Sequence, residues 1–133
     1  MPELTCVVVT PEQTALEQKA DFVALPLYDG EIGIAANHSP MIGRLGYGEM
    51  RIKSGNTTTA YYVDGGFVQV AGNVVSVLTN RALPTKALDS AAAEKQLAAA
   101  VARPANTPEL ATIRERAVAQ ARAQVRAARR ARL

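Results

Sequence analysis

The sequence of 133 residues has little of several residue types that mark particular functions. It contains no tryptophan, 5% aromatic residues, one cysteine and one histidine. The scarcity of aromatic side chains argues against a platform on which sugars or bases stack, and a lone cysteine excludes a disulfide framework. Cys6 and His38 lie far apart in the sequence and do not supply the ligand set of a zinc site. We therefore expect no metal, no cofactor and no nucleic-acid partner.

The chain also lacks a recognisable catalytic group. His38 is followed directly by Ser39, and a serine beside its own base in the sequence points away from that base. Cys6 lies in an apolar run and is expected to be an inert, buried strand residue. No pair of carboxylates stands out as a general acid and base. The sequence predicts a noncatalytic protein with no catalytic residue.

Long apolar runs are missing as well. Nowhere do about eighteen apolar residues follow one another without a charge, which is the length that a membrane-spanning helix needs. The first residues, Met-Pro-Glu-Leu-Thr-Cys, lack the basic and apolar regions of a signal peptide, and no Arg- and Ser-rich leader is present. These features favour a bacterial protein that acts in the cytoplasm.

Charge divides the chain into two parts. Residues 1–86 hold eight acids and six bases, whereas residues 87–133 hold four acids and nine bases. The net charge of +3 therefore hides a slightly acidic first part and a basic tail. We expect two domains with a boundary after Lys86.

Short strands are predicted throughout residues 1–86. Apolar or alternating runs are separated by Gly, Pro, Asn and Asp, and no helical period occurs among them. Expected strands cover residues 4–9, 21–28, 32–35, 42–45, 48–53, 57–63, 67–70 and 74–79, with residues 16–20 ambiguous. Expected turns fall at residues 29–30, 54–56, 64–66 and 71–73. Many short strands at close spacing favour an antiparallel sandwich or barrel.

One segment in this part combines unusual residues. Residues 30–40 read Gly-Glu-Ile-Gly-Ile-Ala-Ala-Asn-His-Ser-Pro, with an acid, the only histidine and two glycines. Glycine permits backbone conformations that other residues avoid, and Pro40 restricts the exit of the loop. Glu31 and His38 are therefore expected in a defined geometry that contacts a partner. A tight surface hairpin with solvated polar residues is the alternative.

From Ala87 onward the composition changes to strong helix formers, and two helices are predicted. The first begins near Asp89 or Ser90 and ends before Pro104, and the second begins at Thr107-Pro108-Glu109 and runs to Arg132. Their expected apolar faces comprise Ala93, Leu97, Ala100 and Val101 in the first helix, and Leu110, Ile113, Ala117, Ala121, Val125 and Ala128 in the second. The two faces predict an antiparallel hairpin.

The seam of this hairpin is mostly alanine, and alanine buries little apolar area. A weakly packed helix pair is a candidate for an element that opens, and a permanently folded hairpin is the alternative. Residues 114–133 contain seven arginines and one acid, and Arg122, Arg126 and Arg130 recur at four-residue spacing. This stripe is interpreted either as a solvated face or as a docking surface for an anionic partner.

Together these features resemble the epsilon subunit of bacterial rotary ATP synthases. The resemblance rests on residues 30–34 followed by Asn37-His-Ser-Pro40, on residues 64–70 (Asp-Gly-Gly-Phe-Val-Gln-Val) and on the alanine-rich tail. It covers the whole chain. It implies an α+β fold, in which an N-terminal antiparallel β-sandwich (residues 1–86) precedes a C-terminal antiparallel two-helix hairpin (residues 87–133).

The resemblance also implies a function and partners. The protein is expected to be a noncatalytic central-stalk subunit that couples proton flow to ATP synthesis. Expected partners are the gamma subunit, the ring of c subunits, and the alpha and beta subunits of the catalytic head when the tail extends. The expected location is peripheral, on the cytoplasmic face of the bacterial inner membrane, with the membrane reached only through the complex.

The resemblance also implies roles for individual residues, which are assigned by their positions in the shared motifs. Glu31, Gly33, His38 and Pro40 are expected to contact the c ring. The arginines Arg114, Arg116, Arg122 and Arg126 match in kind the basic residues that meet the catalytic head and block ATP hydrolysis.

Some members of this family bind ATP through a Leu-Asp-x-x-Arg-Ala motif at the start of the first helix. Here Leu88 and Asp89 are present, but Ala92 stands in place of the arginine, which removes a bidentate phosphate contact. Asp89, Arg122 and Arg126 would be the remaining nucleotide contacts, and an N-cap role is the alternative for Asp89. A rival function for the whole chain is a free-standing anion-binding module that uses the arginine-rich helix.

Overall fold

The computed structural model describes residues 3–130, without the side chain of Ala15. The described residues form two compact units, one up to Pro84 and one from Thr85 onward. Within this part of the chain, no helix is both long and apolar enough to cross a lipid bilayer.

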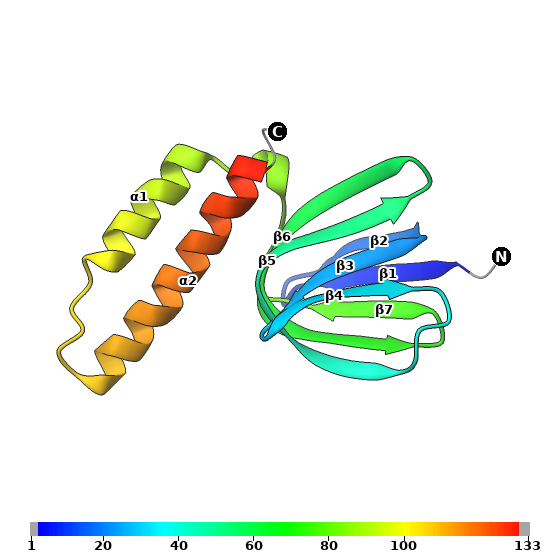
Figure 1. The fold of residues 1–133 in the computed structure, drawn as a ribbon, viewed down its shortest axis with the longest axis horizontal. Helices are drawn as coiled ribbons and strands as arrows, with labels where there is room; N and C mark the ends of the chain where they lie inside the picture. The colour runs from blue at the N-terminus through cyan, green and yellow to red at the C-terminus, as the bar shows by residue number, and fades with distance from the viewer. Residues whose placement is uncertain (1–2, 131–133) are drawn as a thin grey trace. The chain divides into compact units, whose positions relative to one another are not determined.

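The first unit is one β-sheet that folds over on itself (Figure 1). Its strands are β1 (Leu4–Val9), β2 (Thr14–Ala20), β3 (Phe22–Leu27), β4 (Gly30–Ala35), β5 (Met41–Ser54), β6 (Thr57–Ala71), β7 (Val74–Leu78) and β8 (Ala82–Pro84). They lie in the order β2-β1-β7-β6-β5-β3-β4, and β8 also pairs with β6. Neighbours are antiparallel except β1 and β7, which run parallel. Strand β4 is therefore an edge strand with β3 as its neighbour.

Strands β5 and β6 are continuous where the sequence predicted breaks. The expected turn at residues 64–66 is wrong, because Asp64 pairs with Tyr47 and Gly66 pairs with Leu45 inside the β5–β6 ladder. Gly65 and Gly66 have φ angles of 71° and 109°. Glycine adopts these angles without steric cost, so the strand bends and keeps its pairing.

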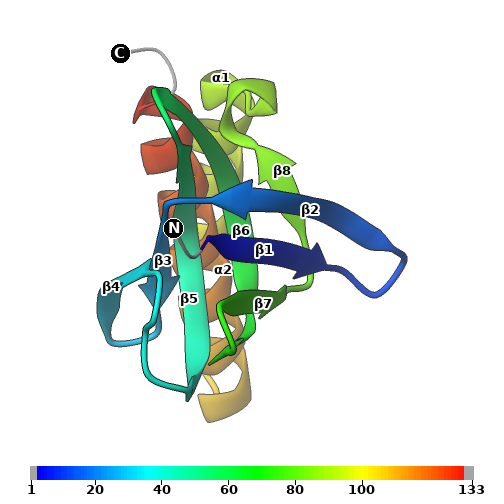
Figure 2. The ribbon, with the colours of Figure 1, turned by 90° about the vertical axis from the view of Figure 1, so that its right-hand side faces the viewer.

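The bend lets the two long strands serve both layers of the sandwich. One half of β6 pairs with β7 and the other half with β8. Figure 2 shows β1 and β2 crossing in front of β5 and β6. The core between the layers consists of buried apolar side chains: Leu4, Cys6, Val8, Ala20, Val23, Leu25, Ile34, Leu45, Met50, Ile52, Val63, Val68, Val70, Val75 and Val77. The predicted β-sandwich is confirmed.

The expected strand at residues 32–35 is confirmed, and it begins two residues earlier than predicted. Gly30–Ala35 forms β4, and the connection to β5 is restricted to residues 36–40. Strand β4 pairs with β3 from Leu27 opposite Gly30 to Phe22 opposite Ala35. The β-branched residues Ile32 and Ile34 suit a strand, and the strand also includes the two glycines of the segment.

The second unit begins with a short 3-10 helix, η1 (Thr85–Ala87), and continues with α1 (Ser90–Val101) and α2 (Pro108–Arg130). The side chain of Asp89 accepts a hydrogen bond from the N–H of Ala91 at 2.9 Å and caps α1. The Thr107 hydroxyl accepts one from the N–H of Leu110 at 3.1 Å and caps α2. Both predicted helix starts are confirmed. The predicted end at Arg132 lies outside the described residues.

Helices α1 and α2 pack as the predicted antiparallel hairpin. Ala93, Ala100, Ala121, Val125 and Ala128 of the expected seam are buried, whereas Val101, Leu110 and Ile113 are 46%, 37% and 51% exposed. Their expected burial is wrong, and the reason is helix length. Arg114 donates from Nε to the carbonyl oxygen of Val101, the last residue of α1, so the first turns of α2 extend past the end of α1.

Candidate functional site

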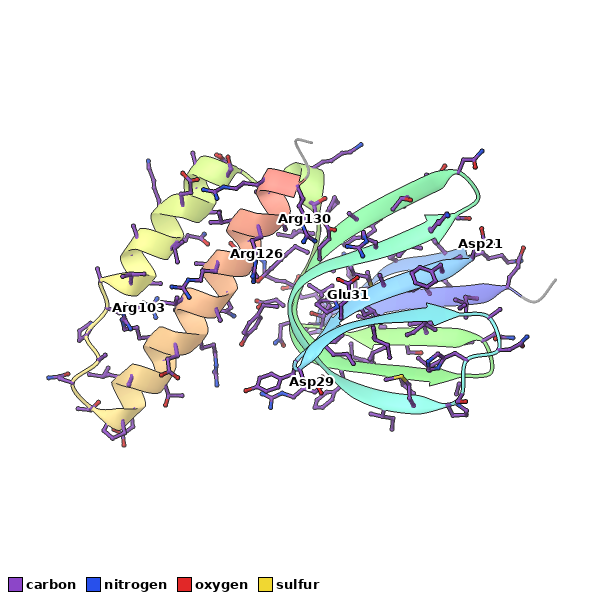
Figure 3. The ribbon with its side chains drawn as sticks, in the orientation of Figure 1. Asp21, Asp29, Glu31, Arg103, Arg126 and Arg130 are labelled. Carbon is purple, nitrogen blue, oxygen red and sulfur yellow. The ribbon has the colours of Figure 1, made fainter. Side chains whose placement is uncertain are left out.

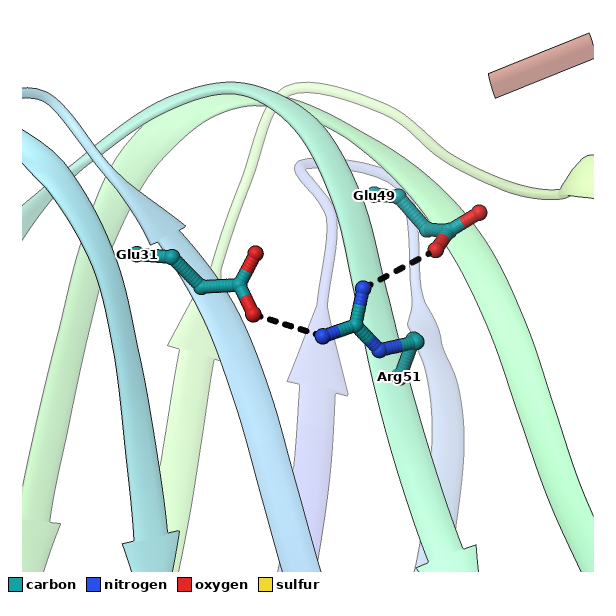
Figure 4. A network of polar contacts seen from close by, with 3 residues as sticks. All are labelled: Glu31, Glu49 and Arg51. Atoms are coloured by element: carbon teal, nitrogen blue, oxygen red, sulfur yellow. Dashed lines mark hydrogen bonds and ion pairs between the residues drawn. The ribbon is translucent and has the colours of Figure 1, made fainter. Parts of the chain in front are cut away.

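A three-residue ionic network holds Glu31 on the surface of the sheet (Figure 4). Arg51 Nη2 lies 2.6 Å from Glu31 Oε1, and Arg51 Nη1 lies 3.3 Å from Glu49 Oε1. Ala24 of β3 pairs with both Gly33 of β4 and Arg51 of β5, so β4 and β5 lie on either side of β3. Burial acts to lower the pKa of Arg51, but the hydrogen bonds and charges of the two carboxylates outweigh it and raise that pKa.

The two acids of this network differ in access to solvent. The Glu49 side chain is 10% exposed, whereas that of Glu31 is 51% exposed. Glu49 therefore anchors the guanidinium in the sheet, and Glu31 presents a carboxylate oxygen outward while its other oxygen stays paired with Arg51. Asp29 lies near Glu31 at the same end of the sheet, and Asp21 lies toward the other end (Figure 3).

Gly33, between these ends, faces an aromatic ring. A side chain at Gly33 would collide with the ring of Phe22, which lies over it from β3. The glycine thus accommodates an aromatic side chain that is 40% exposed. An aromatic ring that covers a strand glycine stabilises the edge of a sheet.

His38 lies in the connection after β4, and hydrogen bonds define its surroundings. His38 Nδ1 lies 2.7 Å from the carbonyl oxygen of Ser39. A carbonyl oxygen only accepts, so a proton is assigned to Nδ1. The N–H of Asn37 donates to Oδ1 of Asn73 at 2.7 Å, which ties this connection to the turn between β6 and β7.

The structure therefore does not bring the four expected ring contacts into one loop. Glu31 lies near the start of β4 and His38 and Pro40 lie beyond its end. From Glu31 to Ala35 alone the strand spans about 13 Å, at about 3.3 Å per residue. Glu31, Gly33 and the His38 connection are instead arranged along one edge strand.

A second feature of the first unit is an exposed apolar face. Ile42 is 76% exposed and Tyr28 70% exposed. Arg44 is two residues from Ile42 and pairs with Phe67, which pairs with Leu78, so these side chains share one face of the sheet. The Arg44 guanidinium lies 4.4 Å from the centroid of the Tyr28 ring. Clustered apolar side chains of this kind mark interaction surfaces.

Five arginines of α2 differ in their contacts, and Figure 3 labels one of them, Arg126. Arg114 donates to Val101 and Arg129 pairs with Glu94 at 2.8 Å, so both hold the hairpin together. Arg116, Arg122 and Arg126 are exposed, and among residues 3–130 none of these three forms an ion pair. Of the four arginines expected to contact a catalytic head, three are thus presented to solvent and Arg114 is engaged within the unit.

Asp89 is the N-cap of α1, and its carboxylate oxygen Oδ1 accepts the N–H of Ala91. Its alternative role from the sequence, as a helix cap, is confirmed. A carboxylate is not a phosphate ligand without a bridging cation or donor, so the cap position by itself provides no nucleotide site.

Cys6 is fully buried in the sandwich core. Burial raises the pKa of its thiol from 9.0 to about 12, so the thiolate needed for a nucleophile or metal ligand does not form near neutral pH. The described residues contain no group of three or more His, Cys, Asp or Glu side chains arranged to hold a metal ion.

Sequence reasoning missed three residues that define this site: Glu49, Arg51 and Asn73. Glu49 and Arg51 alternate on one strand, a pattern that equally suits solvated residues. Asn73 follows a glycine in a predicted turn and was assigned only to that turn. Arg51 and Asn73 contact residues that are distant in the sequence, and Glu49 joins the network through Arg51. A single sequence does not specify which distant strands lie side by side.

Comparison with known proteins assigns the fold to a family. Residues 3–85 match the family model described as ATP synthase, Delta/Epsilon chain, beta-sandwich domain. The chain is 53% identical over 126 residues to an ATP synthase epsilon chain of Rhodopirellula baltica, which covers 95% of this chain and 98% of that relative. It is 35% identical over 89 residues to the sodium ion specific ATP synthase epsilon chain of Propionigenium modestum, covering 67% of this chain and 65% of that one.

A solved structure shares the fold. A chain in the Euglena gracilis mitochondrial ATP synthase superposes with a TM-score of 0.83 at 21% identity, covering 92% of this chain and 79% of that chain. These findings confirm the resemblance predicted from residues 30–40 and 64–70. The chain belongs to the ATP synthase delta/epsilon family, as an epsilon chain.

Proposed function

We propose that the protein is a noncatalytic subunit of the central stalk of a proton-translocating ATP synthase and couples rotation to ATP synthesis. The observation that carries this proposal is the 53% identity to a curated epsilon chain along 95% of the sequence, a span that enters both units. The protein would be peripheral to the cytoplasmic face of the bacterial membrane and would reach the membrane only through the complex.

The ring contact is proposed to follow the edge strand β4. Glu31, Gly33, His38 and Pro40 lie along this strand and its following connection, and most of β4 is exposed. The Euglena assembly that holds the similar chain comprises F1 together with a c-ring, and a ring neighbour of that kind would suit this edge. Glu31 would meet the ring as a carboxylate already paired with Arg51, so its charge is partly neutralised before contact.

The gamma subunit is proposed to bind the exposed apolar face. Tyr28, Ile42, Phe67 and Leu78 offer contact area around the Arg44 guanidinium. Burial of such side chains at an interface supplies binding free energy at roughly 25 cal/mol per Å² before the costs of association. A face of this kind suits a partner that stays bound while the stalk rotates.

The helical unit is proposed to inhibit ATP hydrolysis by meeting acidic segments of the alpha and beta subunits. Arg116, Arg122 and Arg126 are the exposed cations that support this role, with Arg114 available only if the hairpin opens and its bond to Val101 breaks. Opening would also break the exposed Arg129–Glu94 pair, which contributes little in water. The hairpin is therefore held weakly enough to change conformation.

Nucleotide binding by the helical unit is proposed to be weak. The carboxylate of Asp89 caps α1, and Ala92 occupies the position of the family's arginine. Arg122 and Arg126 are the remaining phosphate partners. The rival function, a free-standing anion-binding module, is not favoured, because the relationship to epsilon chains extends over 98% of the length of one relative.

The proposal is tested by ATP hydrolysis of the purified synthase carrying either the full chain or a chain ended after Lys86. We expect both to assemble, and the shortened chain to raise hydrolysis, more so at low salt because salt screens the arginines. A double variant, Arg122→Gln with Arg126→Gln, should reproduce the rise, whereas Arg81→Gln, which removes an exposed arginine of the first unit, should not. Failure of the full chain to join the synthase would refute the stalk assignment, and unchanged hydrolysis would refute inhibition by the tail.

A further inference from the structure

The connection between β4 and β5 covers residues 36–40, and Asn37, Ser39 and Pro40 in it are exposed. Asn37 in this connection has a φ angle of 66°, in the left-handed region. Asparagine adopts this region at a lower cost than most residues, and a hydrogen bond from its backbone N–H helps to hold it there. A tertiary hydrogen bond from the Asn37 N–H to Asn73 Oδ1, at 2.7 Å, joins this connection to the turn between β6 and β7.

Asn73 is well placed to act as the anchor. It lies in the two-residue turn between β6 and β7, where Gly72 and Asn73 have φ angles of 56° and 62°. Positive angles at both positions define a type I′ turn, which fixes the direction of the side chain. The carbonyl oxygen of Asn73 also accepts the N–H of Thr5 at 2.9 Å, so β1 holds the turn from a second side.

We propose that Asn73 is the positioning residue for His38 in the contact with the c ring. Its carboxamide holds the amide of Asn37, the residue before His38, against a turn that two other strands fix in place. His38 is thereby held at one place beside the sheet edge, with Nε2 as the ring nitrogen that does not contact Ser39. This inference rests on the proposed ring contact of His38.

A simpler role for Asn73 makes a different prediction. Asparagine tolerates positive φ better than most residues and occurs in such turns for that reason alone. If turn formation were its only role, glycine would serve equally well at position 73. If the carboxamide is the functional group, glycine fails and aspartate, which keeps an acceptor oxygen and tolerates the same φ, succeeds.

Two measurements separate these roles. In the full chain, amide hydrogen exchange of Asn37 should rise about tenfold in Asn73→Gly, as expected for loss of one hydrogen bond, and stay near the wild-type rate in Asn73→Asp. In the reconstituted synthase, ATP-driven proton pumping per ATP hydrolysed should fall in Asn73→Gly and in His38→Ala, and stay near wild type in Asn73→Asp. Asn56→Gly, the same change at the tip of the β5–β6 hairpin, should affect neither measurement.

The outcomes are distinguishable. Unchanged exchange of Asn37 in Asn73→Gly would overturn the anchor. A rise in exchange with normal pumping in Asn73→Gly, alongside impaired pumping in His38→Ala, would overturn the positioning role and leave the ring contact of His38 standing. Normal pumping in both variants would overturn the ring contact of His38 and the inference with it.

Discussion

At the scale of single residues, a few positions with positive φ decide how the sheet turns and bends. Gly72 and Asn73 form a tight turn, whereas Gly65 and Gly66 lie inside β6 and let it bend. The same type of residue thus ends a strand in one place and curves it in another. The difference arises from the partners opposite: Leu45 and Tyr47 continue the ladder on both sides of the bend.

Among these glycines, Gly66 leaves the least room for a side chain. We expect Gly66→Ala to lower the free energy of unfolding by about 3 kcal/mol or more, because its Cβ would collide with the carbonyl oxygen of Leu78 and its φ of 109° disfavours any side chain. Gly55→Ala is the control: it has φ of 60° and open space around its Cβ, and should cost about 1 kcal/mol. Chemical denaturation measures both, and equal losses would contradict the collision.

Cys6 predicts a pH dependence. Its thiol has a pKa raised by burial to about 12 in the folded protein, against an ordinary value of 9.0. The unfolded state therefore loses this proton first as pH rises, and stability that is complete below about pH 9 falls between pH 9 and 12 by up to about 1.4 kcal/mol per pH unit. Cys6→Ala should be less stable near neutral pH, because it leaves a small cavity, but it should lose this slope. Denaturation curves of both proteins at pH 8, 9, 10 and 11 test this prediction. If the free energy of unfolding depends on pH in the same way in the wild type and in Cys6→Ala, the prediction is wrong.

At the scale of elements, caps and helix lengths shape the second unit. Both helices begin at residues whose side chains accept a first-turn N–H, so their starts are sharply defined. Their unequal lengths leave Leu110 and Ile113 exposed beyond the end of α1. An alanine seam, the Arg129–Glu94 ion pair and the bond from Arg114 to Val101 join two helices that have well-formed starts.

Substitution of Asp89 tests its role as the N-cap of α1. Replacing it with alanine should destabilise α1 by about 1 kcal/mol, because the N–H of Ala91 loses its acceptor. Asp89→Asn keeps a capping oxygen and should be close to wild type. Hydrogen exchange of the Ala91 amide is the measurement. Should asparagine prove as damaging as alanine, the carboxylate charge rather than the cap would be the property that matters.

At the scale of the whole molecule, the two units differ in what stabilises them. The core cluster and the partly buried apolar residues packed on it all lie between Leu4 and Ala82, within the first unit. The second unit buries mainly alanine and one valine. The first unit therefore has the apolar burial that independent folding requires.

A chain ended after Lys86 should accordingly remain folded. Its thermal midpoint is expected within about 8 °C of that of the full chain, a difference that corresponds to roughly 1 kcal/mol for a domain of this size. Circular dichroism at a strand-sensitive wavelength follows the transition. A shortened chain without a cooperative transition would show that the helices are needed for the sandwich to fold.

The sequence predicted what depends on local physics. Apolar runs and turn residues located the strands, and Thr107-Pro108-Glu109 located a helix start, because both signals act over a few residues. It did not predict the bend at Gly65-Gly66, since a glycine pair suits a turn equally well. It also did not predict the bonds of Arg51 to Glu31 and of Asn73 to Asn37, because these join positions 20 and 36 residues apart.

The buried state of Cys6 has a practical consequence. A thiol that is fully covered and protonated near neutral pH reacts slowly with maleimides and disulfide reagents. A cysteine introduced on the surface, for example at His38 or Arg126, would then be the one reactive thiol of the folded chain. Fluorescent labels and crosslinkers can be attached at chosen points of either unit without first removing the native cysteine, so the sandwich core needs no alteration.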